Sequence, residues 1–176
     1  MAQKTVDTTK RAVPFDKANV PGPKMAKPVK AELAGKIISK AKRPLLIVGT
    51  PGADTGLPEI IKTFNSKSIP VAATGSCLKA LKQADVEATY VNLHALVSYL
   101  KDPKWKGFDG NGNYDTAIFI GHTYYYASQL MSTLKNFTTV KVISIDRHYH
   151  PNAQLSFGNL NDDDFRTALK IVAAQL

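Results

Sequence analysis

Cysteine is nearly absent from this sequence, since Cys77 is the single one among 176 residues. One thiol cannot form an intrachain disulfide, which fits a reducing environment. A conventional iron–sulfur cluster takes about four cysteine ligands. The sequence therefore predicts no metal cluster in this chain, and any cluster chemistry would belong to a partner.

Long hydrophobic runs are also missing. No apolar stretch approaches the roughly 20 residues that a helix needs to cross a bilayer. The segment Met1–Thr5 is polar and lacks the apolar core of a signal peptide. We therefore expect a cytoplasmic protein without membrane contact.

Acidic residues are few, with 14 Asp and Glu against 23 Lys and Arg, for a net charge of +9. Residues 1–30 hold seven of the basic and two of the acidic residues, so this short segment alone carries +5. A basic segment can favour RNA or an acidic protein surface. Aromatic residues that stack on bases are limited here to Phe15. We therefore expect no nucleic acid, and interpret the segment as a solvated tail or a protein-docking segment.

Proline separates this segment from the remainder of the chain. Four prolines between residues 14 and 28 break any helix, and the apolar residues there show no period. We expect residues 1–29 to form a basic, proline-containing arm that lies extended on a surface or stays disordered. Residues 30–176 are predicted to form a single α/β domain.

Helical and strand patterns alternate through residues 30–176. The strand segments are short, continuous apolar runs, which are typical of strands buried on both faces in a parallel sheet. This alternation predicts a Rossmann-like sheet with helices on both faces. The expected helices are 30–42, one starting at Pro58, 93–100, 127–134 and one starting at Asn161; the expected strands are Leu45–Val48, Ile69–Thr74, Ala117–Ile120 and Val140–Ile145.

Several short sequence segments are similar to the central domain of thiamine-dependent enzymes. They are Lys42–Gly49, Ile69–Val71, Tyr114-Asp115 before a strand, and Ile143–Asp146. The same fold occurs in NAD- and FAD-binding proteins. This likeness concerns the fold, which does not by itself give an activity.

The carboxyl ends of the predicted strands give the candidate cofactor site. Ligands of open parallel sheets bind there, where helix N-termini attract phosphates. The turn 49–56 lacks the G-x-G-x-x-G fingerprint, because Pro51 takes the place of the second glycine, and it lacks a P-loop. An ordinary strand-to-helix turn is the simpler interpretation. The candidate residues for a dinucleotide or flavin are Gly49, Thr50, Gly52, Thr74, Gly75, Ser76, Gly121, His122, Thr123, Asp146 and Arg147.

Two patterns could suggest a metal, and both are incomplete. Asp109, Asn111 and Asn113 copy the first ligand positions of an EF-hand, but Tyr114 and Ile120 stand where glycine and glutamate belong. His148 and His150 could join His94 or His122 around zinc, which needs three or four converging ligands. We expect no metal, and interpret the histidines as loop and packing residues.

Other candidates carry weaker signals. The loop 101–114 is long and contains Trp105 and Phe108, so it is a candidate docking segment. In Tyr124–Tyr126, successive residues of a helix point about 100° apart, so all three cannot face one ligand. Cys77 near a helix start could be reactive, but no His–Asp partnership is visible, and a small buried residue is the better interpretation. The sequence predicts no catalytic residue.

Taken together, four segments resemble one known family. They are Asp109–Asp115 with the strand and turn to Tyr126, Ile143–Arg147, His150–Ala153 and Ser156–Asn159. These segments are similar to the epsilon subunits of the archaeal acetyl-CoA decarbonylase/synthase complex, which belong to its carbon monoxide dehydrogenase component. The similarity covers most of residues 31–176 and is weak in residues 1–29.

This resemblance implies a partner and a role. Relatives pair with the large alpha subunit, which carries a nickel–iron–sulfur centre, in an alpha2-epsilon2 assembly. The complex interconverts acetyl-CoA with a methyl group, CO₂ and electrons in the one-carbon metabolism of methanogens and related archaea. The epsilon subunit is expected to be structural, or to assist electron transfer to FAD. The alternative is a free-standing NAD- or flavin-binding enzyme on the same fold.

Overall fold

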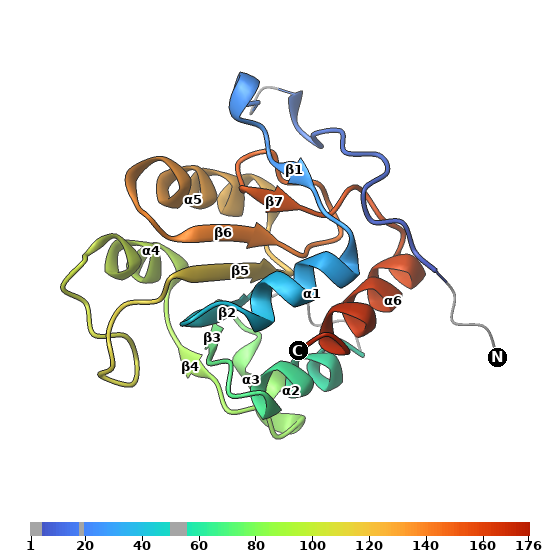
Figure 1. Cartoon of the computed structure of the whole chain (residues 1–176). Coiled ribbons are helices and arrows are strands. Elements are labelled where there is room, and N and C mark those ends of the chain that lie inside the picture. Colours follow the sequence, from blue (N-terminus) through green and yellow to red (C-terminus); the bar gives the residue numbers. More distant parts are fainter. Residues whose placement is uncertain (1–4, 18–19, 50–55) are drawn as a thin grey trace.

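The computed structural model describes residues 5–17, 20–49 and 56–176. These residues form one α/β unit around a parallel sheet of seven strands in the order β1-β7-β6-β5-β2-β3-β4 (Figure 1). The strands are β1 (Lys27–Pro28), β2 (Pro44–Val48), β3 (Val71–Ala73), β4 (Thr89–Tyr90), β5 (Thr116–Ile120), β6 (Lys141–Ser144) and β7 (Leu155–Ser156). The helices are the 3₁₀ helix η2 (Gly22–Lys24), α1 (Ala31–Ser39), α2 (Leu57–Ser66), α3 (Leu78–Gln83), α4 (Leu93–Lys101), α5 (Tyr124–Phe137) and α6 (Asp162–Ala173).

The strand order identifies the type of sheet. From β2 to β7 the strands follow the order of the doubly wound dinucleotide-binding fold, and β1 adds one strand beside β7. The direction of winding reverses between β2 and β5, which pair along their full length from Pro44–Thr116 to Val48–Ile120. This topological switch point is where open sheets of this type bind ligands.

Both faces of the sheet are covered, as the continuous apolar runs predicted. In β2, Leu46 and Val48 belong to one hydrophobic cluster, and Leu45 and Ile47 belong to the other. Helix α6 packs against both α1 and α2 on the first face, and α4 packs against α5 on the second (Figure 1). Successive residues of a strand point to opposite faces, so a strand buried on both must be apolar throughout.

The longer elements lie where the sequence predicted them, and three two-residue strands and α3 were not predicted. Of these, strand β1 differs most from the prediction, because it lies in the arm assigned to residues 1–29. Lys27 pairs in parallel with Leu155 of β7, and the flanking Ala26 and Val29 are buried. The end of this arm is thus an edge of the sheet, which a two-residue strand without any period does not reveal in sequence.

In the described part of the chain, each helix is too short or too polar to cross a membrane.

Candidate functional site

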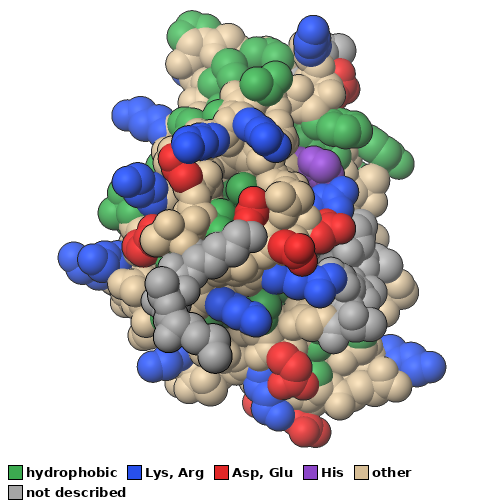
Figure 2. Space-filling model, turned by 90° about the vertical axis from the view of Figure 1, so that its right-hand side faces the viewer, with side chains coloured by type: hydrophobic (Ala, Val, Ile, Leu, Met, Phe, Trp, Pro, Cys, Tyr) green, Lys and Arg blue, Asp and Glu red, His purple; other side chains and the backbone are tan. Residues whose placement is uncertain are grey.

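The carboxyl ends of the strands form one face of the molecule, on the right in Figure 1 and toward the viewer in Figure 2. Acidic, basic and hydrophobic side chains lie close together on this face, and a histidine lies among them near hydrophobic and basic groups. Most of the candidate cofactor residues come from the turns that follow β2, β3, β5 and β6 at this edge. The parallel sheet therefore brings together residues that lie far apart in the sequence.

Gly49 and Gly121 meet at the switch point, directly after β2 and β5. The amide of Gly49 donates to the carbonyl oxygen of Ile120 at 3.0 Å. A Cβ atom built on Gly49 would lie 2.3 Å from the carbonyl oxygen of Gly121. Gly121 itself has a φ of +68°, which favours glycine. Close backbone approach therefore requires glycine at residue 49, and the positive φ favours glycine at residue 121.

The ring of His122 fills the space between these strand ends. Its Nε2 lies 3.1 Å from the carbonyl oxygen of Ile47, so Nε2 carries the proton and Nδ1 is the acceptor nitrogen. Its backbone amide donates to Oδ2 of Asp146 at 3.2 Å. Burial lowers the pKa of His122 to about 4, and this effect outweighs the attraction of Asp146. His122 is therefore a neutral, fixed residue near neutral pH.

Two cavities lie beside His122, which lines both. The switch-point cavity, about 210 Å³, is lined by Gly49, Thr74, Gly75, Tyr90, Asn92, Leu93, His122, Thr123 and Tyr126. The strand-edge cavity, about 480 Å³, is lined by Phe15, Leu57, Gly121, His122, Tyr124, Asp146, Arg147, His148, Asp162, Phe165 and Arg166. Ligand pockets of proteins commonly measure about 300–1,000 Å³. Only the larger cavity reaches this range by itself.

Helix ends give the two cavities different electrostatics. Helix α5 starts after Thr123, whose side chain makes no capping hydrogen bond, so the first amides of this helix remain available to an anion. Helix α6 is capped by the side chain of Asn161, which accepts from the amide of Asp164. Three aspartates follow in the first turn of α6. An anion at this edge is therefore favoured at α5 and disfavoured at α6.

Asp146 and Arg147 organise the wall formed by the end of β6. Asp146 is buried, and its carboxylate accepts from the amides of His122 and Arg147. Arg147 forms an ion pair with Asp162 of α6. The next residue, His148, is half-buried, and desolvation lowers its pKa. Asp146 therefore holds the turn in shape, and Arg147 links the turn to α6.

The structure brings most of the predicted site residues together around two cavities instead of one. Gly49, Thr74, Gly75 and Thr123 line the switch-point cavity, while Gly121, Asp146 and Arg147 line the strand-edge cavity. Ser76 is exposed in the turn after Gly75 and does not line either cavity. The predicted residues Thr50 and Gly52 lie outside the described residues. Further lining residues were not predicted from the sequence; they lie in β4, before α4, in α6 and in the N-terminal segment, and are Tyr90, Asn92, Phe165, Arg166 and Phe15.

The side chains of the calcium-like pattern are used inside the protein. The Asp109 carboxylate accepts from Nη2 of Arg43 at 2.6 Å, and this contact holds its pKa well below the usual range. The Asn113 amide donates to the carbonyl oxygens of Leu100 and Asp102. These contacts fix the conformation of the loop. Among the described residues, no three His, Cys, Asp or Glu side chains converge as metal ligands would.

Cys77 lies inside the domain, as the structural interpretation of the sequence suggested. Its side chain is 3% exposed, and Sγ donates to the carbonyl oxygens of Val48 and Thr74. Burial raises the pKa of the thiol. Cys77 is therefore a packing residue that links the ends of β2 and β3.

Tyr124, Tyr125 and Tyr126 point in different directions, as the helical spacing required. Tyr124 is buried and stacks on His150, with 4.6 Å between ring centroids. Tyr125 is 70% exposed. Tyr126 is half-buried, and its hydroxyl lies 2.6 Å from Nδ1 of His94. The three tyrosines therefore do not form one stacking surface.

The aromatic residues of the 101–114 loop pack on their own domain. Trp105 and Phe108 are half-buried, with 5.2 Å between their ring centroids. Both also contact the ring of the buried Tyr114. Docking of a partner through this loop stays a prediction, and it would use only the uncovered edges of these rings.

Comparison with known proteins shows which proteins this chain is related to. The family described as "CO dehydrogenase beta subunit/acetyl-CoA synthase epsilon subunit" matches residues 8–172. "Acetyl-CoA decarbonylase/synthase complex subunit epsilon 1" of Methanosarcina barkeri is 48% identical over 165 residues, which cover 93% of this chain and 95% of that protein. Subunit epsilon 2 of Methanosarcina mazei is 49% identical over 165 residues, with the same coverage of 93% and 95%. Subunit epsilon of Methanothrix soehngenii is 43% identical over 180 residues, covering 99% and 96%.

Solved structures are much more distant. D-arabinose dehydrogenase from Sulfolobus solfataricus aligns with a TM-score of 0.42 at 17% identity, covering 82% of this chain and 49% of that one. The sequence relatives, in contrast, match over nearly the whole of both chains. The chain therefore belongs to the family of CO dehydrogenase beta subunits and acetyl-CoA synthase epsilon subunits.

Proposed function

We propose that this chain is a non-catalytic accessory subunit of an acetyl-CoA decarbonylase/synthase complex. It would dock on the large alpha subunit that carries the nickel–iron–sulfur centre, in an alpha2-epsilon2 assembly. The names of the relatives, which are subunits of such a complex, support this role. The single cysteine supports it as well, because a cluster takes about four thiolates.

We further propose that the chain assists electron transfer by binding FAD at the switch point. The observation that carries this proposal is the uncapped start of α5, next to Gly121 and between the two cavities. Backbone amides at a helix start fit a pyrophosphate. Arg147 and the aromatic wall of Phe15 and Tyr124 lie on the larger side. When bound, FAD would supply a group that takes up and passes on electrons.

The site residues depart from the usual NAD-binding pattern. NAD-binding sheets of this type place an acidic residue about 20 residues after the glycine-rich turn, at the end of the next strand, to bind the ribose hydroxyls. Here the strand next to β2 is followed by Thr74, whose hydroxyl donates to the carbonyl oxygen of Val48 at 3.0 Å. This observation counts against the alternative of a free-standing NAD-dependent enzyme. A free-standing flavoenzyme would differ from an accessory subunit by showing flavin-dependent activity as an isolated chain.

FAD binding is tested by titrating FAD into the free chain and into the complex with the alpha subunit, while following flavin fluorescence. Thr123→Asp keeps a residue that caps helices and places a negative charge at the start of α5. It should weaken binding about tenfold or more, since one unfavourable charge contact of about 1.4 kcal/mol has that effect. Gln129→Glu, an exposed change farther along α5, is the matched control.

The outcomes separate the parts of the proposal. Saturable binding that Thr123→Asp leaves unchanged would place the flavin elsewhere. Absence of binding in both states would leave a purely structural subunit. Failure to co-purify with the nickel-containing subunit would contradict the accessory role itself. The mass of the complex in solution measures the proposed alpha2-epsilon2 composition.

A further inference from the structure

Residues 5–15, called the strap below, lie across the carboxyl edge of the sheet beside the start of α6 (Figure 1). Thr8 is the anchor in the middle, and it is completely buried. Its hydroxyl donates to the carbonyl oxygen of Val29 at 2.7 Å. Its own carbonyl oxygen accepts from the amide of Gly158 at 2.7 Å. The strap is thus held to the body of the domain by polar contacts.

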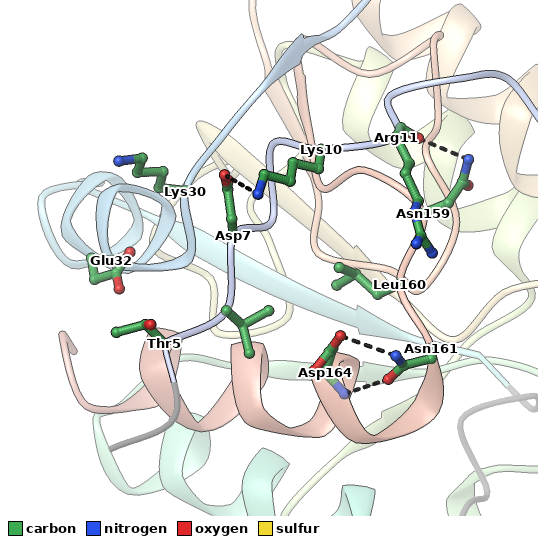
Figure 3. Close-up of a pocket in the computed structure, with 11 residues that line it drawn as sticks. Thr5, Asp7, Lys10, Arg11, Lys30, Glu32, Asn159, Leu160, Asn161 and Asp164 are labelled. Carbon is green, nitrogen blue, oxygen red and sulfur yellow. Dashed lines mark hydrogen bonds and ion pairs between the residues drawn. The ribbon is translucent and has the colours of Figure 1, made fainter. Parts of the chain in front are cut away.

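Asn159 holds the next part of the strap. Its backbone amide and its side-chain amide both donate to the carbonyl oxygen of Arg11, at 3.2 and 2.9 Å. The side-chain amide also donates to the carbonyl oxygen of Val13 at 2.8 Å. Figure 3 shows Asn159 reaching the strap backbone at Arg11. Most of the hydrogen bonds that hold the strap therefore come from the two-residue segment 158–159.

Gly158 allows the strap to approach this segment closely. A Cβ atom at this position would lie 1.8 Å from the carbonyl oxygen of Lys10, far inside any real contact. The obstructing atom belongs to the strap backbone, so a side chain at residue 158 would displace the strap. The backbone of the strap therefore lies directly against the backbone of the loop after β7.

Few hydrophobic side chains hold the strap in place, namely the partly buried Val6 and Ala12, which pack against the two hydrophobic clusters. Thr8 is its single buried residue, while Val13 and Phe15 are 57% and 70% exposed. Arg11 has a φ of +55°, a strained conformation for a residue other than glycine. Segments with few buried apolar contacts open at low free energy while the core stays folded. The strap has these properties, whereas every residue of β5 is buried.

The strap forms walls of two cavities. Thr5, Asp7, Lys10 and Arg11 line a cavity of about 760 Å³ against the starts of α1 and α6 (Figure 3). Phe15 lines the strand-edge cavity together with Arg166, and its ring centroid lies 5.3 Å from that of Tyr124. Moving the strap would therefore open both of these cavities.

We propose that the strap is a removable wall. Residues 5–15 detach together from the segment 158–159, and this movement opens the strand-edge cavity while the sheet stays folded. The hydrogen bonds at Gly158 and Asn159 hold the closed state, and Phe15 covers the cavity in it. A ligand or partner that needs the inner surface of this cavity would bind the open state.

The test measures access to the cavity. Arg166→Cys places a thiol in its wall, and its rate of reaction with dithiobis(nitrobenzoate) reports opening; the buried Cys77 serves as the internal reference. Adding Gly158→Ala should raise this rate roughly tenfold or more, the effect of losing one or two net hydrogen bonds. Adding Gly56→Ala, where a Cβ atom would meet no atom of the described residues within 4 Å, should leave it unchanged.

Hydrogen exchange gives the second readout. In the unaltered chain the amides of Gly158 and Asn159 should exchange faster than those of Ile118 and Phe119 in β5. Equal rates would mean that the strap opens only with the whole domain, which would overturn the proposal. Gly158→Ala without faster labelling at residue 166 would also overturn it.

Phe15→Ala keeps the proposal testable if Gly158→Ala fails to fold. Phe15 is exposed and touches none of the anchors, so its loss should speed labelling at residue 166 and leave exchange at Gly158 unchanged. Unchanged labelling would show that Phe15 is not a wall of the cavity in solution.

Discussion

Gly49 and His122 lie so close at the switch point that a Cβ atom on residue 49 would stand 2.6 Å from Nδ1 of the histidine ring. The same atom would overlap the carbonyl oxygen of Gly121 at 2.3 Å. His122 cannot move away easily, because Nε2 and its amide are hydrogen-bonded to Ile47 and Asp146. The ends of β2 and β5 are therefore packed without spare room.

Gly49→Ala should consequently destabilise the domain. Overpacking of a well-filled site costs about 1–3 kcal/mol. We expect a loss of this size in the free energy of unfolding, measured by urea denaturation. Gly56→Ala is the control and should change stability less, because within the described part of the chain its Cβ would meet no atom within 4 Å. Equal midpoints for both variants would contradict the tight packing described at the switch point.

Two buried histidines should make the protein sensitive to acid. Burial lowers the pKa of His122 to about 4 and that of His150 to about 3, against 6.5 for the free side chain. Between these values the unfolded chain binds protons that the folded chain excludes. Stability is therefore complete above about pH 6.5 and falls toward pH 4 and 3, by up to about 1.4 kcal/mol per pH unit for each histidine.

Urea denaturation at several pH values checks this acid sensitivity. His122→Gln retains a donor for the carbonyl oxygen of Ile47 but does not titrate, so it should reduce the dependence of stability on pH between pH 6.5 and 4. His94→Gln, on the exposed face of α4, is the matched control. An unchanged pH dependence in His122→Gln would mean that His122 is not held neutral by burial.

Arg43 should fix the loop that carries the single tryptophan. Its guanidinium group lies 5.1 Å from the centroid of the Tyr114 ring and donates to Asp109 and to the carbonyl oxygen of Gly112. Trp105 packs on the other side of this cluster, 5.6 Å from Tyr114. Arg43→Met should loosen the loop and shift the fluorescence of Trp105 to longer wavelength, since the ring becomes more exposed to water.

Far-ultraviolet circular dichroism of Arg43→Met should stay unchanged, because the sheet does not depend on this contact. Lys104→Met, an exposed change in the same loop, serves as the control. An unchanged emission spectrum in Arg43→Met would show that the aromatic cluster holds the loop without the arginine.

The isolated chain should not oxidise CO. Its one cysteine is buried and hydrogen-bonded inside the domain, so it does not supply the thiolates of a cluster. The measurement is reduction of an artificial electron acceptor by CO, together with nickel and iron analysis of the purified chain. The complex with the alpha subunit is the positive control. Stoichiometric metal together with CO-dependent reduction in the isolated chain would contradict the accessory role.

Much of the fold was predictable because buried parallel strands have a simple pattern. Runs such as Leu45–Val48 are apolar without interruption, and the structure puts alternate residues into the two cores. Strand β1 was not predictable, since Lys27 and Pro28 have exposed side chains and pair with β7 through the backbone alone. Backbone pairing of a two-residue edge strand leaves no periodic signal.

The sequence could indicate that a candidate site lies at the carboxyl edge of the sheet, but it could not indicate the shape of the cavities there. Parallel strands necessarily end at one edge, so Gly49, Gly121 and Asp146 could be grouped from the sequence. The sequence could not show that the His122 ring would stand between two cavities, because that depends on the 3.1 Å contact with Ile47, 75 residues away. Phe15 was missed as a cavity wall for a similar reason, since the strap is positioned by Gly158 and Asn159.

The sequence by itself determined the class of fold, the absence of a cysteine set for a cluster, and the family, because these depend on composition, local periodicity and short motifs. Tertiary structure alone decided which side of the carboxyl edge is open, which helix start can accept an anion, and where the strap lies. These features arise from backbone contacts between segments as distant as Thr8 and Gly158. Such contacts depend on the shape of the chain and are carried by groups that every residue shares, so they leave no mark in the order of side chains.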